Sequence, residues 1–316
     1  MGLAAAMVIA MGIDAVLGWP AAVYQRIGHP VTWLGRLIKT IDDRFNVAGE
    51  SFRLRRMKGV VALLAVAAAA AVPSLVVQSL LPPTFTGTVL LGVLAWPFVA
   101  SRSLYDHVAA VAVPLGNRDL STARSAVAMI VGRDTSKLDE AGVARAAIES
   151  LAENASDGIV APIFWGVLLG LPGIAGYKAI NTLDSMIGHR TPRHEAFGWA
   201  SARVDDVANF VPARFTALLL ALVSRKPLAT MSLAVRDAKH HRSPNAGWPE
   251  AAMAGALGTR LSGPRTYHDR IADEPWLNEG GRDASHEDIW KALRLYLFAL
   301  FLLSAICVSV ALVVGR

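Results

Sequence analysis

The chain has 316 residues, of which 53% are hydrophobic and 18% charged, and its mean hydropathy is +0.41. This composition is more apolar than a soluble domain of this size needs, so it indicates a membrane protein. The single cysteine, Cys307, excludes a disulfide scaffold and a cysteine-rich zinc site. The net charge of +6 is explained by basic loops between apolar segments, so we do not infer nucleic-acid binding from it.

Four apolar segments are the firm candidates for membrane spans, because a spanning helix needs about 20 apolar residues. We expect them at about 3–25, 59–81, 86–101 and 295–314. The turn signal Pro82-Pro83 separates the second from the third. The first segment lacks the positive region of a secretory signal, and its one charged residue, Asp14, should face protein rather than lipid.

Two further apolar segments, 159–177 and 207–224, are doubtful spans. The first contains two prolines and four glycines, which is typical of a broken or re-entrant helix, and the second contains Arg214, which is costly in lipid. The sequence predicts an all-α, polytopic integral membrane protein with one helical membrane domain over residues 1–316 and helical cytoplasmic loops. Clusters of Lys and Arg in 20–58 and 225–292 favour the cytoplasmic side for these loops.

Three carboxylates precede the first doubtful span, within ESLAENASDGIVAP at 149–162. Glu149, Glu153 and Asp157 are spaced i, i+4 and i+8, which places them within roughly an 80° arc of one α-helical face. The pattern offers no basic residue to offset their repulsion, so a hard cation such as Mg²⁺ would relieve it. The alternative interpretation is a solvated acidic helix face without a ligand.

A second polar constellation is NTLDSMIGHR at 181–190, where Asn181, Asp184 and Ser185 share one helical face. Its oxygen atoms are candidate ligands, and Arg190 stands at its end. Hydrogen bonds between helices are the alternative interpretation.

A third constellation is FGWASARVDDVANFVPARF at 197–215, which carries Arg203, Asp205, Asp206 and Arg214 in an apolar context. These charges should pair with one another or with a ligand, because exposure to lipid would cost too much.

The fourth constellation is DAKHHRSPNAGWPEAAMAGALG at 237–258. Its consecutive basic residues, followed by Asn245 in a turn and then by a helix start, resemble an anion site. A basic patch on the membrane surface is the alternative. Near the N-terminus, His29 immediately precedes a helix that should begin at Pro30. The nucleotide signatures G-x-x-x-x-G-K-[ST] and G-x-G-x-x-G and the zinc signature H-E-x-x-H are absent, so phosphate chemistry would need a different cradle.

Five motifs in chain order resemble those of one known family. They are HPVTWLG, ESLAENASDGIVAPIFW, NTLDSMIGHR, FGWASARVDDVANFVPARF and HRSPNAGWPEAAMAGALG. In these motifs, from residue 29 to about 267, the chain is similar to the CobD/CbiB family, the adenosylcobinamide-phosphate synthases of cobalamin biosynthesis. The resemblance implies a ligase that uses ATP and Mg²⁺ to join adenosylcobyric acid to (R)-1-amino-2-propanol phosphate, giving adenosylcobinamide phosphate.

Under this resemblance, the polar residues receive hypothetical roles. The Mg²⁺ ligands would be the carboxylates Glu149, Glu153, Asp157 and Asp184, with Asn154 and Asn181 orienting phosphate or metal-bound water. The groups expected to hold substrate phosphates are Ser185, Arg190, Arg203, Lys239, His240, Arg242 and Asn245. His29 or His241 would accept the proton of the amine.

The resemblance also implies a location and partners. We expect a multi-pass protein of a bacterial-type inner membrane, with its active site facing the cytoplasm, where ATP is found. Its expected partners are the corrinoid substrate, aminopropanol phosphate and membrane lipid, and a second copy of the chain is left open as a partner.

Two rival hypotheses stand beside the ligase. A membrane ion or solute transporter would use Asp14, Asp184, Asp205 and Arg214, but it should show internal inverted symmetry, which we do not find in the sequence. A non-catalytic scaffold for corrinoid enzymes is the other.

Overall fold

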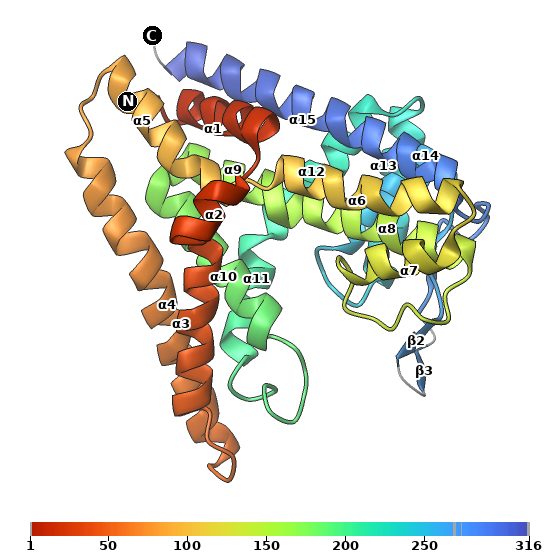
Figure 1. Ribbon diagram of the computed structural model, residues 1–316, viewed down its shortest axis with the longest axis horizontal. Helices are drawn as coiled ribbons and strands as arrows, with labels where there is room; N and C mark the ends of the chain where they lie inside the picture. The colour runs from red at the N-terminus through yellow and green to blue at the C-terminus, as the bar shows by residue number, and fades with distance from the viewer. Residues whose placement is uncertain (1, 268–269, 273, 315–316) are drawn as a thin grey trace. The chain divides into compact units, whose positions relative to one another are not determined.

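The computed structural model describes residues 2–267, 270–272 and 274–314, with the backbone alone considered at 265–267 and 270–272. Most of the described chain is helical and very little of it is strand, which confirms the all-α class (Figure 1). The α-helices are α1 (Leu3–Leu17), α2 (Ala21–Ile27), α3 (Pro30–Phe45), α4 (Phe52–Leu80), α5 (Phe85–Ala95), α6 (Ser101–Gly116), α7 (Leu120–Ala128), α8 (Glu140–Ala155), α9 (Ala161–Leu169), α10 (Leu171–Ile187), α11 (Trp199–Ala208), α12 (Phe210–Val223), α13 (Pro227–Asp237), α14 (Gly247–Leu257) and α15 (His286–Val314). Shorter helical turns are η1 (Trp96–Phe98), η2 (Ser156–Val160) and η3 (Ala238–His240), and the strands are β1 (Leu261–Ser262), β2 (Arg265–Tyr267), β3 (Arg270–Ala272) and β4 (Trp276–Leu277).

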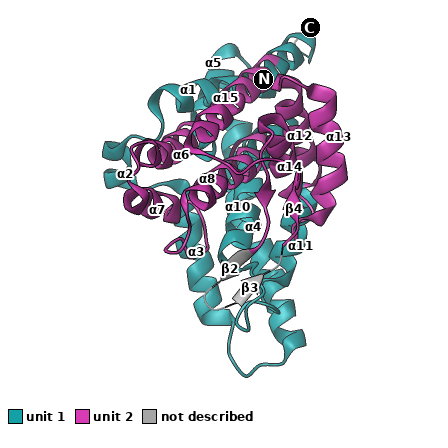
Figure 2. Cartoon of the chain, turned by 90° about the vertical axis from the view of Figure 1, so that its right-hand side faces the viewer, with its two compact units in different colours: residues 1–100, 161–209, 306–316 teal, residues 101–160, 210–305 magenta. Residues whose placement is uncertain are grey.

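The chain packs as two compact units, whereas the sequence predicts one domain. The first unit comprises residues 1–100, 161–209 and 306–316, and the second comprises 101–160 and 210–305 (Figure 2). Each unit is therefore built from segments that are distant in sequence.

The first unit has an apolar core between α3, α4, α10 and α11. Its fully buried members include Ile38, Val66, Leu183 and Phe197, one from each of the three longer helices and one from the loop before α11. Burying side chains of this size contributes about 1.5–3 kcal/mol each relative to exposure. This core fixes the end of α10, where the second polar constellation lies.

The doubtful span 159–177 is broken, as the sequence predicts. α9 has nine residues, and at about 1.5 Å per residue it is too short to cross a bilayer by itself. The break is at Gly170, whose φ of +73° belongs to the left-handed region. Gln78 of α4 closes the break, because its Oε1 accepts the backbone N–H of Leu171 at 2.7 Å.

The N-terminal apolar segment differs from the expected span at 3–25. α1 ends at Leu17, and Pro20 directly precedes α2, because proline restricts the residue before it and cannot donate to a continuing helix. Two helical segments, Leu3–Leu17 and Ala21–Phe45, meet at a bend of 107°. Asp14 is only 3% exposed, so the prediction that it faces protein is confirmed.

Three helical segments of the described chain are long and apolar enough to cross a membrane: Phe52–Leu80, Phe85–Gly116 and His286–Val314. They contain the expected spans at 86–101 and 295–314 and nearly all of 59–81. Two bent helix pairs, α1 with α2–α3 and α11 with α12, raise the number to five if each pair forms one span. The protein is thus a multi-pass membrane protein.

The second unit combines α6–α8 and α12–α14 with most of α15. Tyr296 of α15 is buried and donates its hydroxyl to the carbonyl of Ser101 at the start of α6, at 2.8 Å. Two short antiparallel strand pairs, β1 with β4 and β2 with β3, are not evident in the sequence, because strands of two or three residues show no period.

We predict that Gly170→Ala lowers the thermal stability of the detergent-purified protein. A Cβ at this position would meet the side-chain oxygen of Gln78, and the positive φ adds a cost of about 1–2 kcal/mol. Gly12→Ala in α1 is the matched control, because a Cβ there meets nothing within 4 Å. Equal melting temperatures for the two variants would show that the glycine at the break between α9 and α10 is not needed for stability.

Candidate functional site

Polar side chains of the first unit converge where α10 lies against α11. Tyr177 donates its hydroxyl to Asn209 Oδ1 at 2.8 Å, and Asn209 Nδ2 donates to Asp205 Oδ2 at 2.9 Å. Asn181 Nδ2 reaches the second carboxylate oxygen of Asp205, Oδ1, at 3.5 Å. Asp205 is only 8% exposed, so amides rather than a cation hold this buried carboxylate.

Two more carboxylates lie around Asp205. Asp184, which is half-buried in the last turn of α10, and Asp206 both repel its negative charge. Asp206 lies 3.8 Å from the exposed Arg203, a weak surface pair, as the sequence predicts for charges in this segment. Gly188 leaves room for Asp184, because a Cβ at position 188 would collide with its Oδ1.

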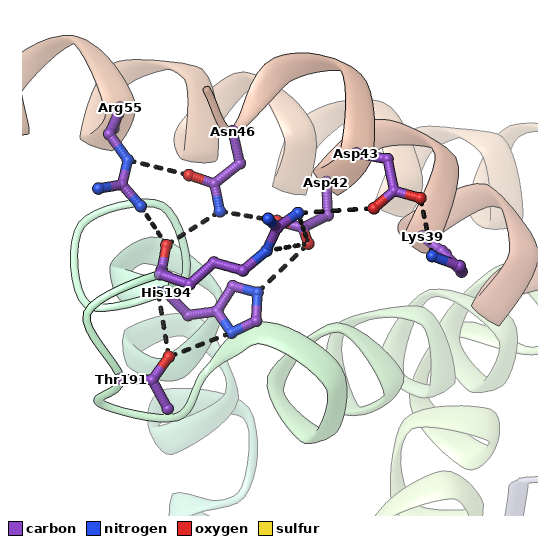
Figure 3. A network of polar contacts seen from close by, with 8 residues as sticks. Lys39, Asp42, Asp43, Asn46, Arg55, Thr191 and His194 are labelled. Carbon is purple, nitrogen blue, oxygen red and sulfur yellow. Dashed lines mark hydrogen bonds and ion pairs between the residues drawn. The ribbon is translucent and has the colours of Figure 1, made fainter. Parts of the chain in front are cut away.

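The loop after α10 is fastened to α3 and α4 by a separate network (Figure 3). Arg193 Nε and Nη2 donate to Asp42 Oδ2 at 3.0 and 2.8 Å, and His194 Nε2 lies 3.3 Å from the same oxygen. Asn46 Nδ2 donates to Asp42 Oδ1 at 2.7 Å, while Asn46 and Arg55 both donate to the carbonyl of Arg193. These contacts occupy the Asp42 carboxylate, so we interpret this network as structural.

Two predicted phosphate-binding residues flank this loop. Ser185 and Arg190 are both exposed, and Ser185 donates its hydroxyl to the carbonyl of Asn181 in its own helix at 2.9 Å. The structure therefore brings Asn181, Asp184 and Ser185 together on α10, as the helical spacing predicts.

In the second unit, Glu149 does not have the environment that the sequence predicts. It is 6% exposed, its Oε2 lies 2.9 Å from Arg133 Nη2, and its Oε1 accepts the backbone N–H of Ser262 at 2.6 Å. Arg145, four residues earlier, places Nε 4.0 Å from Oε1. The prediction that no basic residue offsets Glu149 is wrong, because Arg145 shares its helical face and Arg133 approaches from the preceding loop.

The three carboxylates of 149–157 also do not share one environment. Glu149 is buried, Glu153 is exposed and Asp157 is half-buried. α8 ends at Ala155, and Asp157 lies in the π-helical turn η2, whose wider turn changes the angle per residue that the sequence argument assumes. Asn154 is exposed, and its amide donates to the carbonyl of Ser150 at 2.9 Å.

Glu149 does not fit the role of a resident Mg²⁺ ligand, because its Oε2 lies 2.9 Å from Arg133 Nη2 and its Oε1 accepts the backbone N–H of Ser262. Across the part of the chain that the structure describes, no three His, Cys, Asp or Glu side chains form a group that could hold a metal ion. Metal binding by Glu153, Asp157 or Asp184 stays a prediction.

The consecutive basic side chains after α13 lie in different environments. Lys239, His240 and Arg242 are exposed, and Arg242 Nη1 lies 3.7 Å from Glu274 Oε1. The His241 side chain turns inward, so that its Nε2 lies 3.5 Å from Glu250 Oε1.

Asn245, by contrast, is buried and helps to hold the guanidinium group of Arg214. Its Oδ1 accepts from Arg214 Nη1 at 3.1 Å, and the same nitrogen donates to the carbonyl of Phe210 at 2.7 Å. The guanidinium also lies over the rings of Phe210 and Trp248, at 3.6 and 4.8 Å from their centroids. Among the described residues, Arg214 is therefore held by neutral acceptors and aromatic faces rather than by a carboxylate, and the predicted alternative of pairing with a ligand stays a prediction.

Both predicted histidine bases use Nδ1 as a hydrogen-bond acceptor. His29 is the N-cap of α3, and its Nδ1 accepts the N–H of Val31 at 3.1 Å. His241 Nδ1 likewise accepts the N–H of Ser243 at 3.0 Å. In the neutral ring the other nitrogen, Nε2, then carries the hydrogen, so neither ring has an unused acceptor nitrogen.

The second unit also contains a polar pocket that the motifs do not reveal. Its volume is about 310 Å³, and it is lined by Arg133, Asp134, Lys137, Leu138, Asp139, Arg145 and Pro264. Burial lowers the pKa of Arg145, Glu149 opposes this effect, and the neighbouring charge of Arg133 adds to it. Sequence reasoning misses this pocket. Its basic residues, Arg133, Lys137 and Arg145, come from a loop and a helix, so their spacing has no helical or strand period.

Comparison with known proteins adds the family. The model of the family described as CobD/Cbib protein matches residues 7–296, which is most of the chain. The chain belongs to the CobD/CbiB family. The resemblance in the five motifs is therefore confirmed, and it extends into the apolar flanks.

Curated relatives of the family cover nearly the whole chain. The cobalamin biosynthesis protein CobD of Rhodobacter capsulatus is 61% identical over 300 residues, 95% of each chain. The protein of the same name from Brucella suis biovar 1 is 45% identical, and the match covers 96% of each chain. The one from Rhizobium meliloti is also 45% identical, and the match covers 93% of this chain and 92% of the relative. No solved structure matches the chain.

We predict that Glu149→Gln destabilises the protein even without Mg²⁺, because it leaves the buried charge of Arg133 uncompensated. Removing one partner of a buried pair costs about 3–5 kcal/mol, and Arg133 and Glu149 are each 7% exposed at the side chain. Thermal unfolding in EDTA measures the effect, and Glu153→Gln, at an exposed position, is the control. Unchanged stability in EDTA would instead favour a metal-ligand role for Glu149.

Proposed function

We propose that the protein is a cobalamin-biosynthesis enzyme that joins adenosylcobyric acid to (R)-1-amino-2-propanol phosphate in an ATP-dependent amide ligation, giving adenosylcobinamide phosphate. The observation that carries the proposal is membership of the CobD/CbiB family, with relatives named as cobalamin biosynthesis proteins along 92–98% of their length. The membrane character fits a multi-pass protein of the inner membrane, and we place the reaction on the cytoplasmic side, where ATP is available.

The proposed reaction requires activation of a carboxylate, which is a poor electrophile. An oxygen of the corrinoid carboxylate would attack the γ-phosphorus of ATP, releasing ADP and forming an acyl phosphate. The deprotonated amine would then attack the acyl carbon, and inorganic phosphate would leave with the former carboxylate oxygen. Mg²⁺ is proposed as part of the substrate Mg-ATP, since magnesium is commonly held by substrate phosphates and only one or two carboxylates.

Three carboxylates of the first unit, Asp184, Asp205 and Asp206, are candidates for proton transfer or for contact with the metal–nucleotide substrate. Asp184 is half-buried beside the exposed Ser185, and the charge of His189 acts on it, whereas Asp205 is held by amides that leave its charge unneutralised. With both histidines committed through Nδ1, a carboxylate of this group is the better candidate for accepting the amine's proton.

We predict that the purified protein makes adenosylcobinamide phosphate when supplied with adenosylcobyric acid, aminopropanol phosphate and Mg-ATP. Mass spectrometry of the corrinoid product and measurement of ADP check this. Reactions without the amine, and reactions with unphosphorylated aminopropanol, are the controls. Folded protein that consumes no ATP and gives no product would refute the proposed ligation.

We also predict that Gly188→Ala lowers kcat/KM by about tenfold or more, a loss of about 1.4 kcal/mol of transition-state stabilisation. The φ of −74° at this C-cap is accessible to alanine, but the added methyl group would collide with the Asp184 carboxylate and with the Asp184 carbonyl oxygen, so the end of α10 has to shift. Gly280→Ala is the control, because a Cβ there meets nothing within 4 Å. Wild-type kinetics for Gly188→Ala would remove Asp184 from the proposed reaction.

A further inference from the structure

The pocket before and along α8 combines charges of both signs in a small volume. Its volume of about 310 Å³ lies at the lower end of the range for small-molecule sites, so it suits a compact ligand and excludes a corrinoid. Its charged lining contains three cations, Arg133, Lys137 and Arg145, and two carboxylates, Asp134 and Asp139.

Two of the cations have unused donors. Arg145 Nε is buried and has no hydrogen-bond acceptor among the described residues, because its distance of 4.0 Å to Glu149 is too long for a hydrogen bond. Lys137 is exposed, and the described residues offer it no ion pair. Arg133 is anchored by Glu149 at 2.9 Å, which fixes its position in the wall. A buried donor without a hydrogen-bond partner is unfavourable, so Arg145 favours a ligand with acceptor oxygens.

The two carboxylates are held in place by backbone groups. Asp139 is the N-cap of α8, and its Oδ1 accepts the N–H of Gly142 at 2.7 Å. Asp134 Oδ1 accepts the N–H of Ser136 at 2.9 Å. The backbone N–H of Gly142 carries no full charge, so Asp139 presents a fixed anionic group beside the cationic ones. A simple anion would gain from the cations and be repelled by Asp139.

We propose that this pocket binds a small zwitterion that carries both a phosphate group and an ammonium group. The phosphate is received by Lys137, Arg145 and Arg133, since guanidinium groups match phosphate oxygens and lysine supplies a point charge. The ammonium group is received by Asp139. This inference rests on the proposed function and makes the pocket the subsite for the phosphorylated amine, separate from the nucleotide.

The test uses the full chain in detergent and isothermal titration calorimetry. O-Phosphoethanolamine is the zwitterionic probe, and inorganic phosphate and ethanolamine each carry one half of its charge pattern. We expect phosphoethanolamine to bind at least about tenfold more tightly than either half. Tighter binding of inorganic phosphate than of phosphoethanolamine would overturn the proposal, because it would indicate a plain anion site.

Two variants separate the roles of the two charges. Lys137→Gln should weaken binding of phosphoethanolamine and phosphate alike, by about tenfold, which is within the effect of losing one charged hydrogen bond. Asp139→Asn should weaken only phosphoethanolamine, because asparagine is as good an N-cap as aspartate and keeps the start of α8. If neither variant changes the affinity for phosphoethanolamine, the assignment is wrong.

Matched controls exist for both variants. Lys226→Gln changes an exposed lysine that does not line the pocket. Asp119→Asn changes the N-cap of α7, whose Oδ1 accepts the N–H of Thr122 at 3.0 Å, in the same way as Asp139→Asn changes that of α8. Both should bind phosphoethanolamine as the wild type does. A comparable loss in these controls would show that the effect is not specific to the pocket, which would overturn the assignment.

The outcome can be separated from that of the ligation assay. If the wild type makes product but Lys137→Gln leaves the KM for aminopropanol phosphate unchanged, the subsite is wrong and the ligase function stands. If the variants alter phosphoethanolamine binding as expected but no product forms, the subsite stands and the ligase function fails. If Lys137→Gln weakens ATP and not phosphoethanolamine, the pocket belongs to the nucleotide and the proposal is wrong.

Discussion

The structure depends on how charge is matched inside an apolar helical framework. A charge removed from water is tolerated only where partners within the protein replace its hydration. Glu149 shows this most directly, because one buried carboxylate joins α8 to Arg133 in the preceding loop and to the backbone of Ser262, 113 residues later. Loss of this one charge would loosen three segments of the second unit together.

Two ways of holding charge can be distinguished, and they separate structural groups from candidate functional ones. Glu149 and Asp42 form ion pairs with arginines, which neutralise their charge and hold segments of the chain together. Asp205 and Arg214 are oriented by amides, carbonyls and aromatic faces, which fix the side chain without cancelling its charge. The second arrangement is the one a binding or catalytic group needs, because the remaining charge can act on a ligand.

Much of the fold follows from composition and from local signals. The long apolar segments, the Pro82-Pro83 turn, the helix beginning at Pro30 and the broken segment near Gly170 are all evident in the sequence, because each depends on residues close together in the chain. The bend after α1 is less evident, because residues 3–25 are almost uniformly apolar and only Pro20 marks the interruption.

The candidate site is less predictable from the sequence, because many of its contacts join residues that are distant in the chain. Helical spacing correctly places Asn181, Asp184 and Ser185 together, since they share one regular helix. It fails for Asp157, because a π-helical turn intervenes. The partners of Glu149 and the walls of the pocket come from loops that only the tertiary structure brings together, and no periodic pattern reports such contacts.

Trp276 of β4 contacts two guanidinium groups, with Arg145 4.9 Å and Arg260 4.4 Å from its ring centroid. Indole fluorescence responds to the electric field across the ring, so this residue is a built-in optical reporter beside the pocket wall. The chain has eight tryptophans, and the contribution of Trp276 is therefore obtained by subtracting the spectrum of a Trp276→Phe variant. Occupancy of the pocket then becomes visible in the emission of the unlabelled protein, without a coupled assay or an attached dye.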